Sequence, residues 1–306
     1  MQYSGELITM IIPIQKDDPS IPTYLVLFSG ILAISTGAIF VRLAEAPALV
    51  IAAYRVGLAS LILIPLAFIK TRDELRHLTI GDVRGVLLAG LFLALHFATW
   101  ISSLKYTSIA NSVVLVNMSP LWVGILAPMI LKEKVHRTTM VGIILSITGC
   151  LIIGSTDLVA GGQTLWGDCL AVIGGLCLAA YLMAGKKLRS RLSLLSYIAM
   201  CYGSAAVVLW LIVLSMGLQI NGFTHQTFAA FWGMAVISQV IGHSCYNWAL
   251  GYCSASLVAL SLLGEPVGST ILAYLLFKEE LTLIKFCGGL LIMTGIYLAA
   301  KQEVSA

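Results

Sequence analysis

Long apolar runs separated by short polar stretches form the dominant pattern of this chain. Each run approaches the ~20 residues with which an α-helix crosses ~30 Å of hydrocarbon. The runs are continuous, whereas the strands of a membrane barrel alternate lipid-facing and lumen-facing residues. The pattern therefore predicts an all-α membrane protein with ten transmembrane helices. The expected spans are 23–43, 48–69, 83–103, 108–131, 138–155, 166–186, 193–216, 227–249, 255–277 and 283–300.

A repeat at a fixed offset of 146 residues runs through these spans. Residues 104–154 align without a gap on residues 250–300, and Pro120 recurs as Pro266. The other matches include Leu104/Leu250, Tyr106/Tyr252, Ile125/Ile271, Lys132-Glu133/Lys278-Glu279 and Thr148-Gly149/Thr294-Gly295. We therefore expect two packed five-helix repeats. The predicted division is a tail at 1–22, a first repeat at 23–155, a second repeat at 166–300 and a tail at 301–306.

The odd number of spans in each copy determines how the copies are related. If each copy crosses the membrane five times, the second copy is inverted relative to the first. Lysine and arginine favour the cytoplasmic side. With a cytoplasmic N-terminus, thirteen of these residues face the cytoplasm and four face outside, while Arg55 lies within a span. We expect both termini to be cytoplasmic, in an inner (plasma) membrane.

Composition narrows the class of protein further. The chain has 306 residues, of which 59% are hydrophobic and 10% charged, and this mixture is too apolar for a soluble domain. No polar stretch approaches the ~50 residues of a small additional domain. The basic residues cluster at helix ends and form no patch, so no nucleic-acid partner is expected. The seven cysteines lack a CxxC pair, so we expect them to pack, without any metal or cofactor.

Polar residues inside the eighth predicted span mark a candidate site. A polar side chain in a span costs several kcal/mol unless it faces protein or water. Gln239, His243 and Asn247 are spaced i, i+4, i+8, so on an α-helix they share one face. Tyr246 flanks this polar stripe. The spacing predicts that the stripe lines a cavity.

The third predicted span carries a related pair. His96 and Trp100 share a helix face, and Trp100 aligns with Tyr246 in the repeat. Tyr181 of the sixth span aligns with Ser35 of the first, which adds a ring to one side of the expected cavity. Rings, amides and imidazoles together suit a small amphipathic solute. The alternative is that these groups only hydrogen-bond neighbouring helices.

The ninth predicted span contains Glu265 directly before Pro266. Proline removes a backbone donor and kinks a helix. Because Pro120 lies at the matching depth of the fourth span, the two prolines are candidate hinges. Glu265 has no acidic counterpart in the first repeat. It is a candidate for proton transfer, for pairing with Arg55 or for binding a cationic group, and the alternative is a carboxyl that only packs at the kink.

Four further polar residues have mainly structural explanations. Arg55 lies about two turns into the second span. We favour a structural ion pair or a side chain that extends to the interface, with binding of a solute carboxylate as the alternative. Asn111 and Asn117 are expected to make interhelical contacts. Asp168 is expected to cap the sixth span or to interact with its dipole.

The order of these motifs resembles one known family. Each repeat places a proline before Lys-Glu and then Gly-x6-Gly, at Gly142–Gly149 and Gly288–Gly295. The sequence Ala-Ala-Tyr-Arg-Val-Gly at 52–57 resembles an arginine motif of the second span. In these features the chain is similar to EamA-type permeases of the drug/metabolite transporter superfamily, over about residues 25–300. The resemblance implies an inner-membrane carrier of small metabolites such as amino acids.

The resulting hypothesis is a secondary transporter, and more specifically an exporter, of a small amphipathic metabolite by alternating access. His96, His243 and Glu265 are the candidates for proton coupling, since histidine titrates near neutrality. The expected partners are the solute, the bilayer and protons as a candidate coupling ion, for a chain that acts as a monomer or homodimer. An uncoupled facilitator, a channel and a non-transport scaffold are the alternatives. An enzyme is not expected, because no HExxH, GxSxG or phosphate-binding loop is present.

Overall fold

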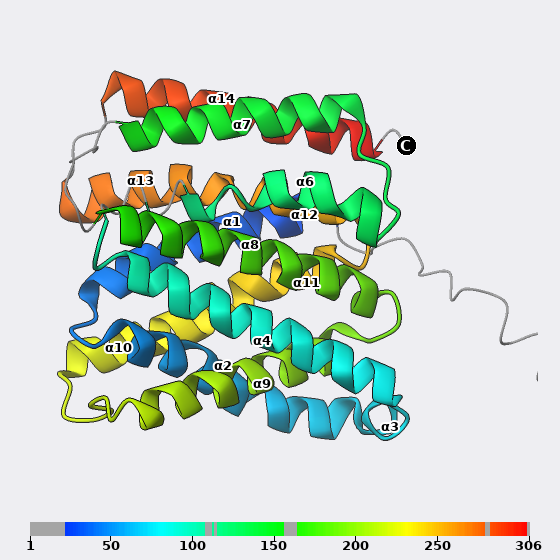
Figure 1. The fold of residues 1–306 in the computed structure, drawn as a ribbon, viewed down its shortest axis with the longest axis vertical. Coiled ribbons are helices and arrows are strands. Elements are labelled where there is room, and N and C mark those ends of the chain that lie inside the picture. The colour runs from blue at the N-terminus through cyan, green and yellow to red at the C-terminus, as the bar shows by residue number, and fades with distance from the viewer. Residues whose placement is uncertain (1–21, 108–111, 113–114, 156–163, 279–281, 305–306) are drawn as a thin grey trace, which may run out of the picture.

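The computed structural model describes residues 22–107, 112, 115–155, 164–278 and 282–304, as drawn in Figure 1. Within these ranges every regular element is a helix and no strand is present. The helices are α1 (Thr23–Leu43), α2 (Ala48–Lys70), α3 (Arg72–Arg76), α4 (Ile80–Ser103), α6 (Ser119–Ile130), α7 (Arg137–Ser155), α8 (Thr164–Arg189), α9 (Leu194–Ser215), α10 (His225–Gly233), η1 (Met234–His243), α11 (Ser244–Ala249), α12 (Ala255–Ser261), α13 (Gly264–Phe277) and α14 (Leu283–Val304).

Seven helical stretches are long and apolar enough to cross a membrane. They are Thr23–Leu43, Ala48–Lys70, Ile80–Ser103, Leu165–Arg189, Leu194–Ser215, His225–Ala249 and Ala255–Phe277. Three shorter apolar helices, Ser119–Ile130, Arg137–Ile152 and Phe286–Lys301, fall in the predicted fourth, fifth and tenth spans. The structure thus confirms an all-α protein with multiple apolar spans. Ten complete spans stay a prediction.

The prolines of the predicted fourth and ninth spans lie where helices are interrupted. The sequence predicted kinks at these prolines, and α6 begins at Ser119, with Pro120 in its first turn. In the ninth span α12 ends at Ser261 and α13 begins at Gly264. The physical reason is that proline disfavours helical geometry at the preceding residue and is best accepted in a first turn.

The eighth span also departs from the expected α-helix. Between α10 and α11 the backbone winds as a π-helix, η1, over Met234–His243. The aligned residues of the first repeat lie in α4, which is α-helical throughout Ile80–Ser103. π-Helices are rare and occur frequently at functional sites. The two aligned spans are similar in length, 24 and 25 residues, and differ in winding.

Helices α7 and α14, which occupy aligned positions in the two repeats, pack against each other along one edge of the molecule (Figure 1). A Cβ atom at Gly142 would lie 2.5 Å from the carbonyl oxygen of Gly295. One at Gly149 would collide with the carbonyl oxygen of Gly288. Because 142 faces 295 and 149 faces 288, the two helices are antiparallel. Glycine is required here because the backbones touch.

Other helix contacts also occur between aligned pairs of helices. Helix α4 packs on α8, and their aligned partners η1 and α1 pack on each other. Helices α2 and α9, which are also aligned partners, contact each other directly. Even a local backbone detail recurs: Lys132 and Lys278 both have positive φ, 57° and 56°, immediately after their helices. Each repeat therefore makes equivalent contacts with the other.

Polar contacts tie the connecting segments together at each end of the bundle. At one end Glu133 accepts from the amide of Ala255 (3.1 Å) and pairs with Lys186 (3.9 Å), whereas Arg191 pairs with Asp82 (3.4 Å). At the other end the amide of Glu45 donates to Thr227 (3.1 Å), the hydroxyl of Tyr54 to Ile220 (2.7 Å) and that of Thr107 to Asp168 (2.6 Å). Asp168 lies inside α8 rather than before it, so the capping prediction was wrong.

Candidate functional site

Arg55 of α2 is buried at the centre of the helices that carry the predicted site. Its side chain is 2% exposed, so the expectation that it extends to the interface was wrong. Its Nε donates to Gln239 Oε1 at 2.8 Å, and its guanidinium carbon lies 4.2 Å from the ring centroid of Phe97. The amide and the ring hold the guanidinium inside the bundle, which explains why it does not turn outward.

The two predicted histidines lie on either side of Phe97. The His96 ring lies 4.9 Å from Phe97 and is stacked on Trp100 at 5.9 Å, with only 5° between the ring planes. His243 meets Phe97 edge-on at 5.4 Å. His96 Nδ1 lies 3.0 Å from the carbonyl oxygen of Gly174, and because a carbonyl only accepts, Nδ1 carries the hydrogen. Phe97 itself carries no polar signal and was missed by the sequence analysis.

Asn247 is fully buried and its amide is already engaged by two tyrosines. Tyr181 donates to its Oδ1 at 2.9 Å, and its Nδ2 donates to the hydroxyl of Tyr202 at 2.9 Å. The Tyr181 ring also lies 6.4 Å from that of His243. The structure therefore brings Asn247, Tyr181 and His243 together. Tyr202 of α9 was missed, because a single tyrosine in an apolar span has no distinguishing spacing.

Three buried polar atoms of the predicted site have no hydrogen-bond partner among the described residues. They are Gln239 Nε2, Trp100 Nε1 and Tyr246 Oη. A buried polar atom without a partner costs ~1–3 kcal/mol. Trp100 and Tyr246 are aligned positions of the two repeats, so the unpaired groups occur in both halves. These atoms retain the capacity to form a hydrogen bond.

Glu265 lies in the first turn of α13 and keeps part of its surface accessible. Glu265 and Arg55 are the two oppositely charged residues of the predicted site region. No ion pair within 4.0 Å joins the two, although both belong to the described part of the chain. Ser35 of α1 donates to the backbone carbonyl of Glu265 at 3.4 Å, which anchors the α12–α13 break against the first helix.

The other predicted residues lie at the edges of this arrangement. Pro120 and Pro266 are buried where α6 and α13 begin. Asn117 is buried just before α6, and Asn111 lies outside the described residues. Ser35, which aligns with Tyr181, bonds within its own helix to Ile31 at 2.7 Å.

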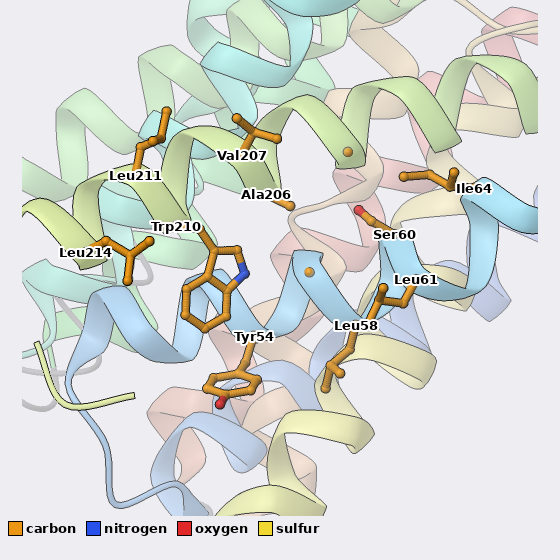
Figure 2. A pocket seen from close by; sticks show the side chains of 12 residues that line it. Tyr54, Leu58, Ser60, Leu61, Ile64, Ala206, Val207, Trp210, Leu211 and Leu214 are labelled. Atoms are coloured by element: carbon orange, nitrogen blue, oxygen red, sulfur yellow. The ribbon is translucent and has the colours of Figure 1, made fainter. Parts of the chain in front are cut away.

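A separate groove of about 470 Å³ lies between α2 and α9 (Figure 2). The aligned glycines Gly57 and Gly203 line this groove together with Tyr54 and Trp210, whose ring centroids lie 5.1 Å apart. Its rim is apolar and outward-facing, with Leu61 70% exposed. None of the predicted site residues lines this groove, so it is distinct from the buried polar cluster.

Comparisons with known proteins agree with this architecture. The model of the EamA-like transporter family matches residues 21–155 and again 165–301. An uncharacterized transporter of Archaeoglobus fulgidus is 26% identical over 297 residues, which cover 92% of this chain and 98% of the relative. The uncharacterized transporter YyaM of Bacillus subtilis is 26% identical over 81% of this chain and 83% of its own length.

A solved crystal structure has a similar fold, with a TM-score of 0.75 at 15% sequence identity, over 92% of this chain and 98% of that chain. This likeness concerns the fold alone. The family match accounts for the multiple apolar helices and indicates transport rather than catalysis. The resemblance inferred from the sequence is confirmed: the chain belongs to the EamA-like transporter family of membrane transporters.

Proposed function

We propose that this protein is a secondary transporter that moves a small amphipathic solute, such as an amino acid, by alternating access and in the direction of export. The observation that carries the proposal is the buried polar cluster where the two repeats meet. Arg55 and His96 come from the first repeat, and Gln239, His243 and Glu265 from the second. Charged and polar groups within spans mark solute and ion pathways.

The packing supports two inverted five-helix repeats with ten spans. Aligned helices α7 and α14 contact each other in antiparallel fashion, and the α4–α8 contact has its counterpart in η1–α1. The polar contacts at the two ends join segments that a ten-span topology assigns to the same side. Inverted repeats of this kind place solute sites at the repeat interface.

The difference in winding between α4 and η1 supports two conformations. Two copies of one unit that pack symmetrically differ in state when one is α-helical and the other π-helical. In the opposite-facing state the copies exchange shapes. We assign Pro120 and Pro266 as the hinges, because each lies at a helix start where backbone geometry changes most easily.

The orientation in the membrane follows from the distribution of positive charge. The end that contains Lys186, Arg191 and Glu133 also carries most of the lysine and arginine, which favours the cytoplasm. On this basis both termini are cytoplasmic and the membrane is the inner (plasma) membrane. A monomer contains both halves of the cluster and is sufficient for transport, and a homodimer is compatible with it.

The solute site comprises His96, Trp100, Tyr181, Gln239, His243, Tyr246, Asn247 and Glu265. Transport is either coupled to protons through His96, His243 or Glu265, or it is uncoupled facilitation. Asn247 and Tyr181 already satisfy each other, which favours a shaping role for them. The atoms free to meet a solute belong to Trp100, Gln239 and Tyr246.

The test begins with a thermal-shift screen of the purified protein, because a solute bound by the folded state raises its stability. Aromatic and apolar amino acids come first, then nucleosides and quaternary amines. The best hit is loaded into proteoliposomes, and uptake of labelled solute is measured with and without unlabelled solute inside. A carrier gives saturable uptake that internal solute accelerates. Linear uptake with no such acceleration indicates a channel, and absence of both binding and uptake indicates a scaffold.

A further inference from the structure

We propose that Arg55 is the anion-binding residue of the buried cluster: it binds a carboxylate of the solute, and Glu265 is the internal counter-ion that this carboxylate replaces. The inference rests on the proposed function and specifies the class of solute. It is carried by the unused hydrogen-bond donors of Arg55 and by the absence of an ion pair between Arg55 and Glu265 among the described residues.

The guanidinium of Arg55 has four N–H groups to spare. A guanidinium offers five donors, and Nε uses one of them on Gln239. Among the residues that the structure describes, no acceptor bonds its terminal nitrogens and no carboxylate lies within 4.0 Å. A buried charge costs several kcal/mol unless it is paired and hydrogen-bonded. The terminal nitrogens therefore have both the capacity and the energetic need for an anionic ligand.

The predicted site holds two further donors that have no partner among the described residues. Gln239 turns Oε1 toward the guanidinium, because its NH₂ group would meet another donor there. This orientation leaves Nε2 pointing elsewhere, buried and unpartnered, as is Trp100 Nε1. Donors are satisfied only by acceptors, and a carboxylate presents two acceptor oxygens that match the planar guanidinium fork. The local chemistry favours an anion over an amine or an ammonium.

Phe97 fixes the orientation of the fork. Its ring lies against the guanidinium at 4.2 Å and is flanked by the rings of His96 at 4.9 Å and His243 at 5.4 Å. A guanidinium held flat against a ring loses little additional freedom when it binds. The surrounding rings also provide apolar surface for the remainder of a solute. The site therefore suits a carboxylate attached to an apolar group.

Glu265 balances the charge of Arg55 in the absence of solute. The two residues form no ion pair within 4.0 Å, although both belong to the described part of the chain. A bound carboxylate adds a second negative charge near one guanidinium, and like charges disfavour each other. Anion binding therefore favours the protonated form of Glu265. The other ionisable groups that face this region are His96 of α4, Cys150 of α7, Tyr181 of α8, Tyr202 of α9, His243 of η1 and Tyr246 of α11.

The experiment uses benzoate, benzamide and benzylamine as probes, which share a ring and differ in the charge of the attached group. Thermal unfolding of the full chain in detergent is measured at millimolar concentrations of each probe. We expect benzoate to raise the midpoint, more so at lower pH, and the neutral and cationic analogues to have at most a small effect. Arg55→Gln should abolish the benzoate shift. Arg42→Gln should preserve it, because Arg42 also stacks on a ring, Phe277 at 4.3 Å, but is exposed.

Glu265→Gln gives an independent result if Arg55→Gln fails to fold. Glutamine mimics the protonated carboxyl, so the variant should bind benzoate more tightly than wild type and without dependence on pH. A benzoate shift that survives Arg55→Gln, or that shrinks in Glu265→Gln, overturns the proposal. So does a panel in which benzylamine stabilises and benzoate does not, although a solute site then still exists. If neither these probes nor the solute screen has any effect and vesicles show no uptake, the proposed function fails as well.

Discussion

Replacing Gly149 by alanine should weaken the contact between the two repeats. An alanine Cβ would lie 2.8 Å from Ile292 Cγ1 and 3.0 Å from the Ile292 amide nitrogen, and closer still to the Gly288 oxygen. Two of these three atoms belong to the backbone of α14, so a rotamer change cannot relieve the overlap. Helices α7 and α14 must move apart, and the contacts between them are lost.

The magnitude follows from two opposing effects. Overpacking a well-packed contact costs about 1–3 kcal/mol, and a backbone obstacle belongs at the upper end of that range. Alanine regains about 1 kcal/mol over glycine within a helix. The net loss in the free energy of unfolding is therefore about 2 kcal/mol. For a chain of this size we expect the thermal midpoint to fall by about 4 °C.

The assay is thermal unfolding of the purified protein in detergent, followed by tryptophan fluorescence, with Gly289→Ala as the matched control. Gly289 lies on the facing helix α14, one residue from Gly288. A Cβ atom at Gly289 would lie 3.7 Å from Val267, which is an ordinary contact. Gly289→Ala should be neutral or stabilising. Gly142→Ala should behave like Gly149→Ala, because its Cβ would lie 2.5 Å from the Gly295 oxygen. Equal midpoints for Gly149→Ala and Gly289→Ala would refute the reasoning.

Three further outcomes are expected. Asn247→Ala should lower the free energy of unfolding by about 3 kcal/mol in the same assay, because the buried hydroxyl of Tyr181 loses its partner. An unchanged thermal midpoint would contradict the hydrogen bonds between Asn247 and the tyrosines. Tyr246→Phe should raise stability by about 1 kcal/mol, since it removes an unpartnered buried hydroxyl, and any loss of stability would mean that the hydroxyl has a partner. Glu133→Gln should weaken the contacts of residue 133 with Ala255 and Lys186, so that a maleimide modifies the buried thiol of Cys253 faster. Equal labelling rates in the variant and the wild type would show that these contacts do not hold this end of the bundle closed.

The sequence predicted the elements that depend on pattern. Continuous apolar runs predicted helices, and the repeat identified which helices are equivalent, because both signals persist over many residues. The polar stripe of the eighth span was also informative, since Gln239 and Asn247 are each buried against polar partners. A polar residue in an apolar span has few places to lie other than against another helix.

What could not be predicted depends on how the helices meet. Arg55 turns inward because Gln239 and Phe97, far away in sequence, provide its partners, and nothing within the second span indicates this. Phe97 and Tyr202 look like ordinary packing residues until their neighbours are known. The π-winding of η1 was invisible because its sequence is compatible with an α-helix, and tertiary packing selects the winding.

The π-winding of η1 bears on the alternating access that we propose. Such segments are often permanent, because an extra residue in the chain must be accommodated somewhere. Here the two copies keep one register on both sides of the segment: α2 and α9 begin at Ala48 and Leu194, and Trp100 still corresponds to Tyr246. No surplus residue separates the two copies, so η1 and α4 differ in winding alone. If the proposed alternating access takes place, a change between the two windings needs no shift of sequence register in the neighbouring helices.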